Sequence, residues 1–384
     1  VRPVLTCLAL LLALLASSCA PKPKPVVDPA LWQEFQSPPR HYAIWQIIQS
    51  FAPDPQERQQ QVHGLANDGF AGIVANVSYD NYLRDEQRWR EFADGLALTH
   101  QASLGFWLYD EQGYPSGAAG GLVLQQHPEY EALGLARLEL PPGNPGTPAG
   151  LVRTEPAPDG KTIAYVEQPM YEGTHCTENV NQKRRYINIL MPEAVRSFLQ
   201  LTHEEYARRF PKEMGNLIWA TFTDEPCLMT FYLGEGNFPP VIPWRHDLPE
   251  VFRQRKGYHL LPHLSQLFGG ETTQETAQVR CDFWELVSDL VAESYFAQIN
   301  NWCQAHGLAS SGHTLMEERM WSQVLAEGHG LKALKQMTVP GCDILPVPPV
   351  TWNLSALISP PKLASSAAHL AGRTQVMSET SDEP

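Results

Sequence analysis

The sequence has little cysteine and no excess of positive charge. Its 384 residues contain 7 Cys, and no two of them form a CxxC-type pair. The spacing therefore supports neither a zinc knuckle nor a disulfide framework. The formal net charge of −14 argues against a nucleic-acid partner, because phosphate binding needs a basic face. A neutral or uncharged substrate is the better match.

A glycine-rich phosphate-binding loop is also missing, since none follows any predicted strand. This absence weakens the case for an open, doubly wound sheet that binds nucleotides. Apolar residues make up 43% of the chain and charged residues 18%, as in an ordinary globular protein. The length suffices for one large domain or two ordinary ones.

The N-terminus carries a short apolar run, Val4–Ala16, after the positive Arg2. It is too short and wrongly flanked for a membrane-spanning helix, so residues 1–19 are predicted to be a secretory signal. Cys19 directly follows small residues and resembles the lipid-bearing cysteine of a lipobox; a plain signal with a chance cysteine is the alternative. Residues 20–36 are expected to be a linker. The predicted location is the bacterial cell envelope, periplasmic or surface, with membrane attachment only through the lipid.

From about residue 41, short apolar runs alternate with helix-like segments, which is the pattern of βαβ units in a parallel sheet. Strands are predicted over Tyr42–Ile48, Ala71–Val77, Leu104–Tyr109, Leu217–Phe222, Leu308–Ser311, Cys342–Val347 and Thr374–Met377. Helices are predicted over Pro55–Asn67, Glu86–Gln101, Pro192–Phe210, Arg280–His306, Met316–Gln336 and Ala364–Ala371.

This alternation predicts an α/β fold, a (β/α)₈ TIM-type barrel over residues 37–384 that lacks its last strand. An open doubly wound sheet is the alternative. Residues from about 130 to 190 interrupt the pattern with Gly/Pro-rich turns and strand-like pieces, so a small β insertion is expected after the third strand. The sequence stops just after the seventh strand, and we therefore expect the barrel to be incomplete within these residues.

Catalytic groups of a barrel lie just past the C-terminal ends of its strands, and acids stand at four such positions here. They are Asp110 and Glu111 after the third strand, Asp224 and Glu225 after the fourth, Glu317 and Glu318 beyond His313 after the fifth, and Glu379 after the seventh. Cleavage of a glycosidic bond needs two carboxyl groups, one a protonated acid and one a base or nucleophile. The convergence of acids predicts a glycoside hydrolase.

Several of these residues have a plainer role open to them. Asp110 could mainly bond backbone amides in its tight turn, and Asp224 fits an orienting role better than that of the acid. Glu317 and Glu318 could be solvated residues in the first turn of a helix, where the dipole favours them. His313 could be a core or metal-ligand histidine as easily as a sugar contact.

The segment Trp107–Gly121, which contains Asp-Glu-Gln-Gly-Tyr-Pro-Ser-Gly, resembles the signature of glycoside hydrolase family 106, the α-L-rhamnosidases. Further segments resemble this family: Phe222–Pro226, Arg255–Tyr258, Ser311–His313 with Glu317, and Ser365–His369 leading to Ser378-Glu379. The resemblance implies a (β/α)₈ catalytic domain with accessory β domains, and hydrolysis of α-L-rhamnosides with inversion. It also implies calcium at the site, Glu225 as general acid and Glu317 as general base.

These observations predict an exported glycoside hydrolase that acts on an oligo- or polysaccharide. Glu225 is expected to protonate the leaving oxygen, and Glu317, or Glu379 as second choice, to activate water. Asp110, Glu111 and His313 are expected to hold sugar hydroxyls or calcium, and Asp224 to orient or contact substrate hydroxyls. Trp107 and Tyr114 are expected to shape the cleft. Two rival functions are a non-catalytic glycan-binding lipoprotein on the same barrel and a metal-dependent hydrolase of another bond.

Overall fold

The computed structural model describes residues 28–38, 43–143, 146–170, 185–230, 241–344 and 354–380. The chain divides into two compact units, Val1–Ala43 and Ile44–Pro384. In the first unit, α2 (Pro29–Gln36) is a short exposed helix that begins where the Asp28 side chain accepts the amide of Ala30. The predicted signal segment, Cys19 and the linker up to residue 27 lie outside the described residues.

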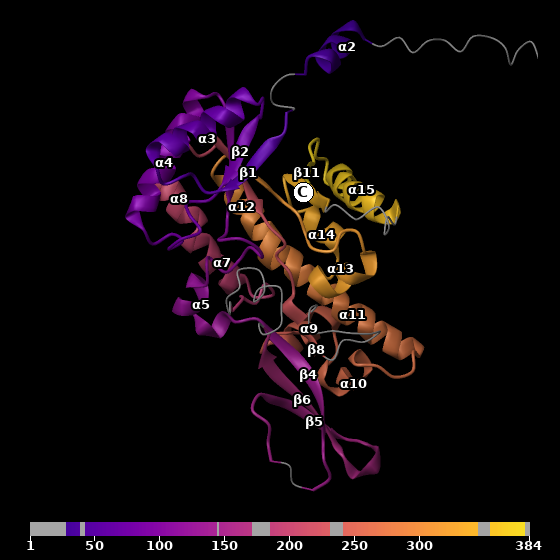
Figure 1. Cartoon of the computed structure of the whole chain (residues 1–384). Coiled ribbons are helices and arrows are strands. Elements are labelled where there is room, and N and C mark those ends of the chain that lie inside the picture. The colour runs from indigo at the N-terminus through magenta and orange to yellow at the C-terminus, as the bar shows by residue number, and fades with distance from the viewer. Residues whose placement is uncertain are drawn as a thin grey trace, which may run out of the picture. The chain divides into compact units, whose positions relative to one another are not determined.

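The second unit is built on a parallel sheet of seven strands, in the order β1-β2-β3-β7-β9-β10-β11 (Figure 1). The strands are β1 (Trp45–Gln49), β2 (Gly72–Ala75), β3 (Gly105–Tyr109), β7 (Ile218–Thr223), β9 (Ala309–Gly312), β10 (Val339–Ile344) and β11 (Met377–Thr380). All neighbouring pairs are parallel, which confirms the seven strands predicted from the sequence. The protein is therefore of the α/β class, with a curled parallel sheet.

Several strand ends differ from the prediction, and two of these differences concern the carboxyl edge of the sheet. The sixth strand begins three residues earlier, at Val339, and the predicted end at residues 345–347 lies outside the described residues. The seventh begins at Met377 rather than ending there, so Glu379 lies within β11 and not in a loop beyond it. Pairing with β10 fixes this register, because Asp343 stands opposite Glu379.

The helices between the first strands match the sequence pattern. They are α3 (Pro55–Asn67) and α4 (Glu86–Gln101), and each begins at an aspartate, Asp54 or Asp85, whose side chain accepts amides of the first turn. Along α4, the residues Trp89, Phe92 and Leu96 lie on one buried face, as their spacing predicts.

The later helices are more divided than the sequence suggests. The predicted Pro192–Phe210 helix breaks at Thr202 into α7 (Pro192–Leu201) and α8 (His203–Arg209). The predicted Met316–Gln336 helix breaks at Gly328, whose φ is 79°, into α13 (Met320–Glu327) and α14 (Gly330–Leu334). The predicted Arg280–His306 helix corresponds to α11 (Gln274–Val291), the π-helix η6 (Ala292–Ala297) and α12 (Gln298–Ala305). The remaining helices are α5 (Leu122–Gln126), α9 (Leu248–Lys256), α10 (Leu264–Leu267), α15 (Leu354–Leu370) and the 3₁₀ turns η2 (Pro128–Tyr130), η3 (Pro158–Gly160) and η5 (Leu261–His263).

A second, antiparallel sheet lies where the β insertion was expected. It consists of β4 (Leu133–Leu140), β5 (Leu151–Pro156), β6 (Thr162–Pro169) and β8 (Val241–Trp244), in the order β5-β6-β4-β8. The last strand comes from beyond the expected insertion, because the second edge of β4 pairs with β8. Figure 1 shows β4, β5 and β6 together at one end of the unit.

The large sheet has an outer face against the helices and an inner, concave face with its own core. Side chains alternate along β3, so Phe106 and Leu108 join the outer core while Trp107 and Tyr109 join the inner one. The Trp107 ring packs 5.3 Å from the Trp45 ring and is 8% exposed. Trp107 lies one pleat deeper than Tyr109 and fills the inner core, and its role in shaping the cleft stays a prediction.

Among the described residues, none of the helices has both the length and the apolar character needed to cross a bilayer.

The close contact between β9 and β7 generates a test of the fold. Gly312 has a φ of 130°, and a Cβ there would lie 2.0 Å from the carbonyl oxygen of Thr223. We expect Gly312→Ala to lower the free energy of unfolding by about 3 kcal/mol or more, from steric overlap and backbone strain. Gly372→Ala is the control, since its φ is 66° but a Cβ there meets nothing within 4 Å; it should lose about 1 kcal/mol. Urea unfolding measures both, and equal losses would contradict the steric argument.

Candidate active site

Polar side chains gather at the carboxyl ends of the strands on the inner face. Every second residue of a strand faces the same side of the sheet. Asp224, Asp343 and Glu379 therefore share the inner face, since they lie two or four residues beyond inner-core residues of their strands, Phe222, Val339 and Met377. Parallel strands present all their carboxyl ends at one edge, so acids that are far apart in sequence meet there.

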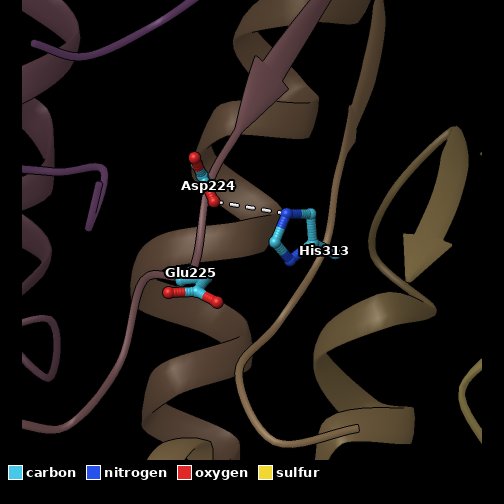
Figure 2. Close-up of side chains that lie close together, drawn as sticks. All are labelled: Asp224, Glu225 and His313. Carbon is cyan, nitrogen blue, oxygen red and sulfur yellow. Dashed lines mark ion pairs between the residues drawn. The ribbon is translucent and has the colours of Figure 1, made fainter. Parts of the chain in front are cut away.

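A chain of hydrogen bonds connects these strand ends. The Tyr109 hydroxyl donates to Asp224 Oδ2 at 2.5 Å. Asp224 Oδ1 lies 3.2 Å from His313 Nε2, and the same nitrogen lies 2.9 Å from Glu379 Oε2. Figure 2 shows Asp224 and Glu225 on the segment after β7, with the His313 ring facing Asp224. Asp224, which follows β7, and Glu379 of β11 thus meet at one imidazole ring, and Tyr109 of β3 joins this group through Asp224.

His313 is fully buried and carries the positive charge of this group. Its Nδ1 lies 2.9 Å from the carbonyl oxygen of Thr314, while Nε2 faces the two carboxylates. A carbonyl oxygen can only accept, so Nδ1 carries a proton, and carboxylates on the other side favour a second proton on Nε2. Burial lowers the pKa of His313, but the hydrogen bonds to Asp224 and Glu379 outweigh it and raise this pKa well above its usual value. The geometry and the electrostatics both favour the imidazolium form of the ring.

Glu225 is half-buried and follows Asp224 in an unusual backbone conformation. Its φ is 48°, in the left-handed region that residues other than glycine rarely adopt. Carboxylate oxygens of Asp224 and Glu225 and a ring nitrogen of His313 all lie within 4.8 Å of one another. The backbone turn therefore keeps the Glu225 carboxyl beside the histidine instead of continuing the strand.

Glu317 is buried beside the same histidine, at 3% exposure. Its Oε1 accepts the amide of Thr314 at 3.0 Å and lies 3.8 Å from His313 Nδ1. Burial raises the pKa of Glu317 to about 8 against the opposing charge of His313, and the charge of Glu225 adds to the rise. Glu317 is thus mostly protonated at neutral pH. A solvated residue in the first turn of a helix, the plainer role considered for Glu317, would be neither buried nor shifted in this way. Glu318, its half-buried neighbour, precedes the start of α13.

Two acids of this region were not singled out from the sequence. Burial raises the pKa of Asp343 to about 7, and one of its buried oxygens has no hydrogen-bond partner among the described residues. Asp343 is the second residue of the predicted strand Cys342–Val347 but the last but one of β10 (Val339–Ile344), so the prediction placed it at the wrong end of the strand. Glu327 on α13 is fully buried, and burial followed by the charge of Glu317 raises its pKa well above the usual value. No local pattern distinguishes Glu327 from an exposed helix residue.

Asp110 and Glu111 were predicted to hold sugar hydroxyls or calcium, but both side chains are fully buried away from the acidic group. Asp110 follows the inner-facing Tyr109, so alternation turns its side chain to the outer face, where it is fully buried near His203 of α8. The Glu111 carboxylate accepts five backbone amides of its own loop, from Gln112, Gly117, Ala118, Ala119 and Gly120, at 2.6–3.1 Å. It is fully buried and holds the loop instead of a sugar hydroxyl.

Tyr114 is the residue of this loop that stays accessible, at 38% exposure. Burial raises the pKa of its hydroxyl, and the charges of Glu225 and Asp224 add to the rise. Tyr114 therefore stands at the rim of the acidic group, where an aromatic ring can face a substrate.

The comparisons with known proteins agree with this chemistry. A family model described as glycoside hydrolase 106, α-L-rhamnosidase, matches residues 187–382, just over half of the chain. Among solved structures, the chain is similar to a rhamnosidase from Novosphingobium sp. PP1Y, with 13% sequence identity and a TM-score of 0.61. This similarity covers 93% of the chain and 54% of that rhamnosidase, so the chain spans about half of its length. No curated protein sequence matches the chain.

The five amides around Glu111 predict a large loss of stability on a small change. In Glu111→Gln, an NH₂ group replaces one carboxylate oxygen and faces backbone N–H groups, so that donor meets donor. The negative charge that strengthens the other hydrogen bonds is also lost. We expect the free energy of unfolding to fall by about 3 kcal/mol. Glu271→Gln, at an exposed position, is the matched control and should change it by less than about 0.5 kcal/mol. Thermal and urea unfolding measure both; a Glu111 variant as stable as its control would show that the loop does not depend on this carboxylate.

Proposed function

The chain belongs to the α-L-rhamnosidase family, glycoside hydrolase family 106, and from this membership we propose that it hydrolyses an α-L-rhamnosyl bond of an oligo- or polysaccharide. The observation that carries the proposal is the meeting of Glu225 and Glu317 with His313 at one edge of the sheet. Two carboxyl groups in different environments are what acid and base catalysis of glycoside hydrolysis requires.

Glu225 is proposed as the general acid that protonates the leaving oxygen. It is the more accessible of the two carboxyls, and its backbone turn sets it beside the buried ring of His313. Asp224 is proposed to orient this histidine and to contact sugar hydroxyls, since Tyr109 and His313 bind its two oxygens. Tyr114 is proposed to shape the rim of the cleft.

Glu317 is proposed as the base that activates water, with Glu379 as the second choice. Glu379 contacts His313 directly and is half-buried. The raised pKa of Glu317 favours a second assignment of the same two residues, because a carboxyl protonated at neutral pH is suited to donate a proton. In that assignment Glu317 is the acid and Glu225 the base.

Calcium is proposed as the metal of the site. Ca²⁺ binds oxygen ligands, and the neighbouring carboxylates of Asp224 and Glu225 fit this preference, as does the unpartnered oxygen of Asp343. The nitrogens of His313 fit it poorly, because both already face oxygen acceptors. When bound, the ion would supply positive charge for holding sugar hydroxyls.

The remaining parts of the proposal rest on the sequence pattern. The parallel sheet is proposed to be the larger part of a (β/α)₈ barrel, because its spatial order follows the chain order throughout. The protein is proposed to be exported and anchored to the cell envelope through lipid on Cys19. A non-catalytic glycan-binding lipoprotein is the alternative, and measurable turnover separates the two.

A leaving-group comparison tests the acid. A natural rhamnoside needs its leaving oxygen protonated, whereas p-nitrophenyl α-L-rhamnoside has a good leaving group and needs this much less. We therefore expect Glu225→Gln to lower kcat/KM on the natural substrate by about 10³-fold and on the aryl glycoside by far less. Glu317→Gln, which removes the base, should lower both by similar factors.

The same two variants test the assignment of roles. Steady-state kinetics on both substrates should show leaving-group dependence for one of the two variants and not for the other. Dependence in Glu317→Gln instead of Glu225→Gln would reverse the acid and the base. Similar losses on both substrates in both variants would remove Glu225 from the role of acid.

The stereochemical outcome tests the mechanism. Inverting hydrolysis places water on the face opposite the leaving group, so an α-L-rhamnoside should release β-L-rhamnose first. Proton NMR of the anomeric signals during the first minutes of turnover measures this, before the anomers equilibrate. An α anomer as first product would mean retention, and a carboxylate nucleophile in place of a base.

A further inference from the structure

Asp110 lies behind the candidate active site, on the outer face of the sheet, and contacts two groups there. The Ser116 hydroxyl lies 2.6 Å from Asp110 Oδ1, and His203 Nε2 lies 3.8 Å from Asp110 Oδ2. Asp110, Ser116 and His203 all have exposed fractions of 0%. Asp110 Oδ2 and His203 Nε2 both lack a partner at hydrogen-bond distance among the described residues, and the Thr223 side chain also interacts with the Asp110 carboxyl.

The bonds around His203 determine where its proton lies. The Thr202 hydroxyl lies 2.8 Å from the carbonyl oxygen of Phe198, to which it must donate. The same hydroxyl lies 2.8 Å from His203 Nδ1, so it accepts there and Nδ1 carries the proton. A neutral ring with its proton on Nδ1 leaves a lone pair on Nε2, which faces Asp110.

The bonds around Ser116 have a fixed direction too. Its hydroxyl oxygen accepts the backbone amide of Asp224 at 2.9 Å and therefore donates its own proton to Asp110 Oδ1. Asp110 thus accepts on Oδ1 and faces a lone pair with Oδ2. A proton on Oδ2 would point toward the lone pair of His203 Nε2, 3.8 Å away. A carboxylate would instead set a negative charge against that lone pair without solvent.

The electrostatics agree with this arrangement. Burial raises the pKa of Asp110 well above its usual value against the hydrogen bond from Ser116, and the charge of Glu111 adds to the rise. Burial lowers the pKa of His203 to about 3. These directions favour the uncharged form of both groups.

Ser116 connects this buried pair to the candidate acid. It accepts the amide of Asp224, and its own amide donates to the Asp224 carbonyl oxygen at 2.8 Å. Both backbone polar groups of Asp224 are therefore held by one serine, and the next residue is Glu225 with its φ of 48°. Such strained backbone persists only where its surroundings fix it.

We propose that Asp110 is an uncharged positioning residue whose carboxylic acid, hydrogen-bonded to Ser116 and lying beside His203, fixes Ser116 on the Asp224 backbone and so sets the orientation of Glu225. This differs from a charged ligand for sugar or calcium. The effect on turnover rests on the proposed function, in which Glu225 acts on the leaving group, whereas the effect on the backbone does not.

The amide variant separates the two roles of Asp110. In Asp110→Asn, the NH₂ group can donate to His203 Nε2 while the carbonyl accepts from Ser116, so kcat/KM should stay within about fivefold of wild type. In Asp110→Ala and Ser116→Ala, kcat/KM on the natural rhamnoside should fall by about 30-fold or more, with a smaller loss on the aryl glycoside. A 100-fold loss in Asp110→Asn would overturn the proposal in favour of a charged ligand.

Ser310 offers a matched control for the serine. It is also buried, donates to Asn300 Oδ1 at 2.8 Å and accepts the amide of Thr338 at 3.0 Å. Ser310→Ala should lower the melting temperature as Ser116→Ala does, without a loss that depends on the leaving group. If the two serine variants lose activity alike on both substrates while Glu225→Gln shows the dependence, the positioning role is wrong and the proposed function stands.

Crystal structures supply a readout that does not need turnover. Glu225 should keep its left-handed backbone in wild type and in Asp110→Asn, and should leave it in Ser116→Ala. An unchanged Glu225 in Ser116→Ala would overturn the proposal whatever the enzyme assays show. If Glu225→Gln shows no leaving-group dependence, the role proposed for Glu225 fails, and the crystal structures still decide whether Asp110 and Ser116 set its backbone.

Discussion

Side chains of a strand alternate between two faces, and this constraint decides which residues of the sheet meet a substrate. On the inner face, Trp45, Trp107 and Trp219 pack together and form an apolar floor. The next inner positions toward the carboxyl ends are Tyr109 on β3 and Asp224 after β7, and a hydrogen bond joins them. A polar edge therefore stands directly on an apolar core, and β3, β7, β10 and β11 or the residues that follow them contribute to both.

Acids gathered at one edge repel one another unless some of their negative charge is neutralised. The imidazolium of His313 supplies one positive charge between Asp224 and Glu379. Protonation neutralises further carboxylates, because burial raises the pKa of Glu317 to about 8 and that of Asp343 to about 7. The site thus holds carboxyls in both protonation states near neutral pH, which is the condition under which one can donate a proton while another accepts one.

The loop after β3 supports this edge from behind without contacting its charges. Glu111 fixes the loop through five amides, and Ser116 in the same loop holds both backbone groups of Asp224. The two acids of the motif between Asp110 and Gly117 therefore have a mainly structural role, although the motif resembles the signature of a catalytic family. Its contribution to chemistry passes through the backbone of Asp224 and Glu225.

The sequence by itself determined the α/β class, the seven strands and the α-L-rhamnosidase family, because apolar runs, helical spacing and short motifs are local properties. It also singled out Glu225, Glu317, Glu379, Asp224 and His313 as candidates, since an acid or histidine at or beyond the end of a strand is visible in one dimension. Only the tertiary structure decided that Trp107 fills the core and that Asp110 faces away from the site, because a shift of one residue along a strand reverses its face. The small sheet likewise drew β8 from residues far along the chain, through pairing that no local pattern encodes. The raised pKa values of Glu317, Asp343 and Glu327 were also decided by the tertiary structure, because burial depends on what the rest of the chain places around each carboxyl.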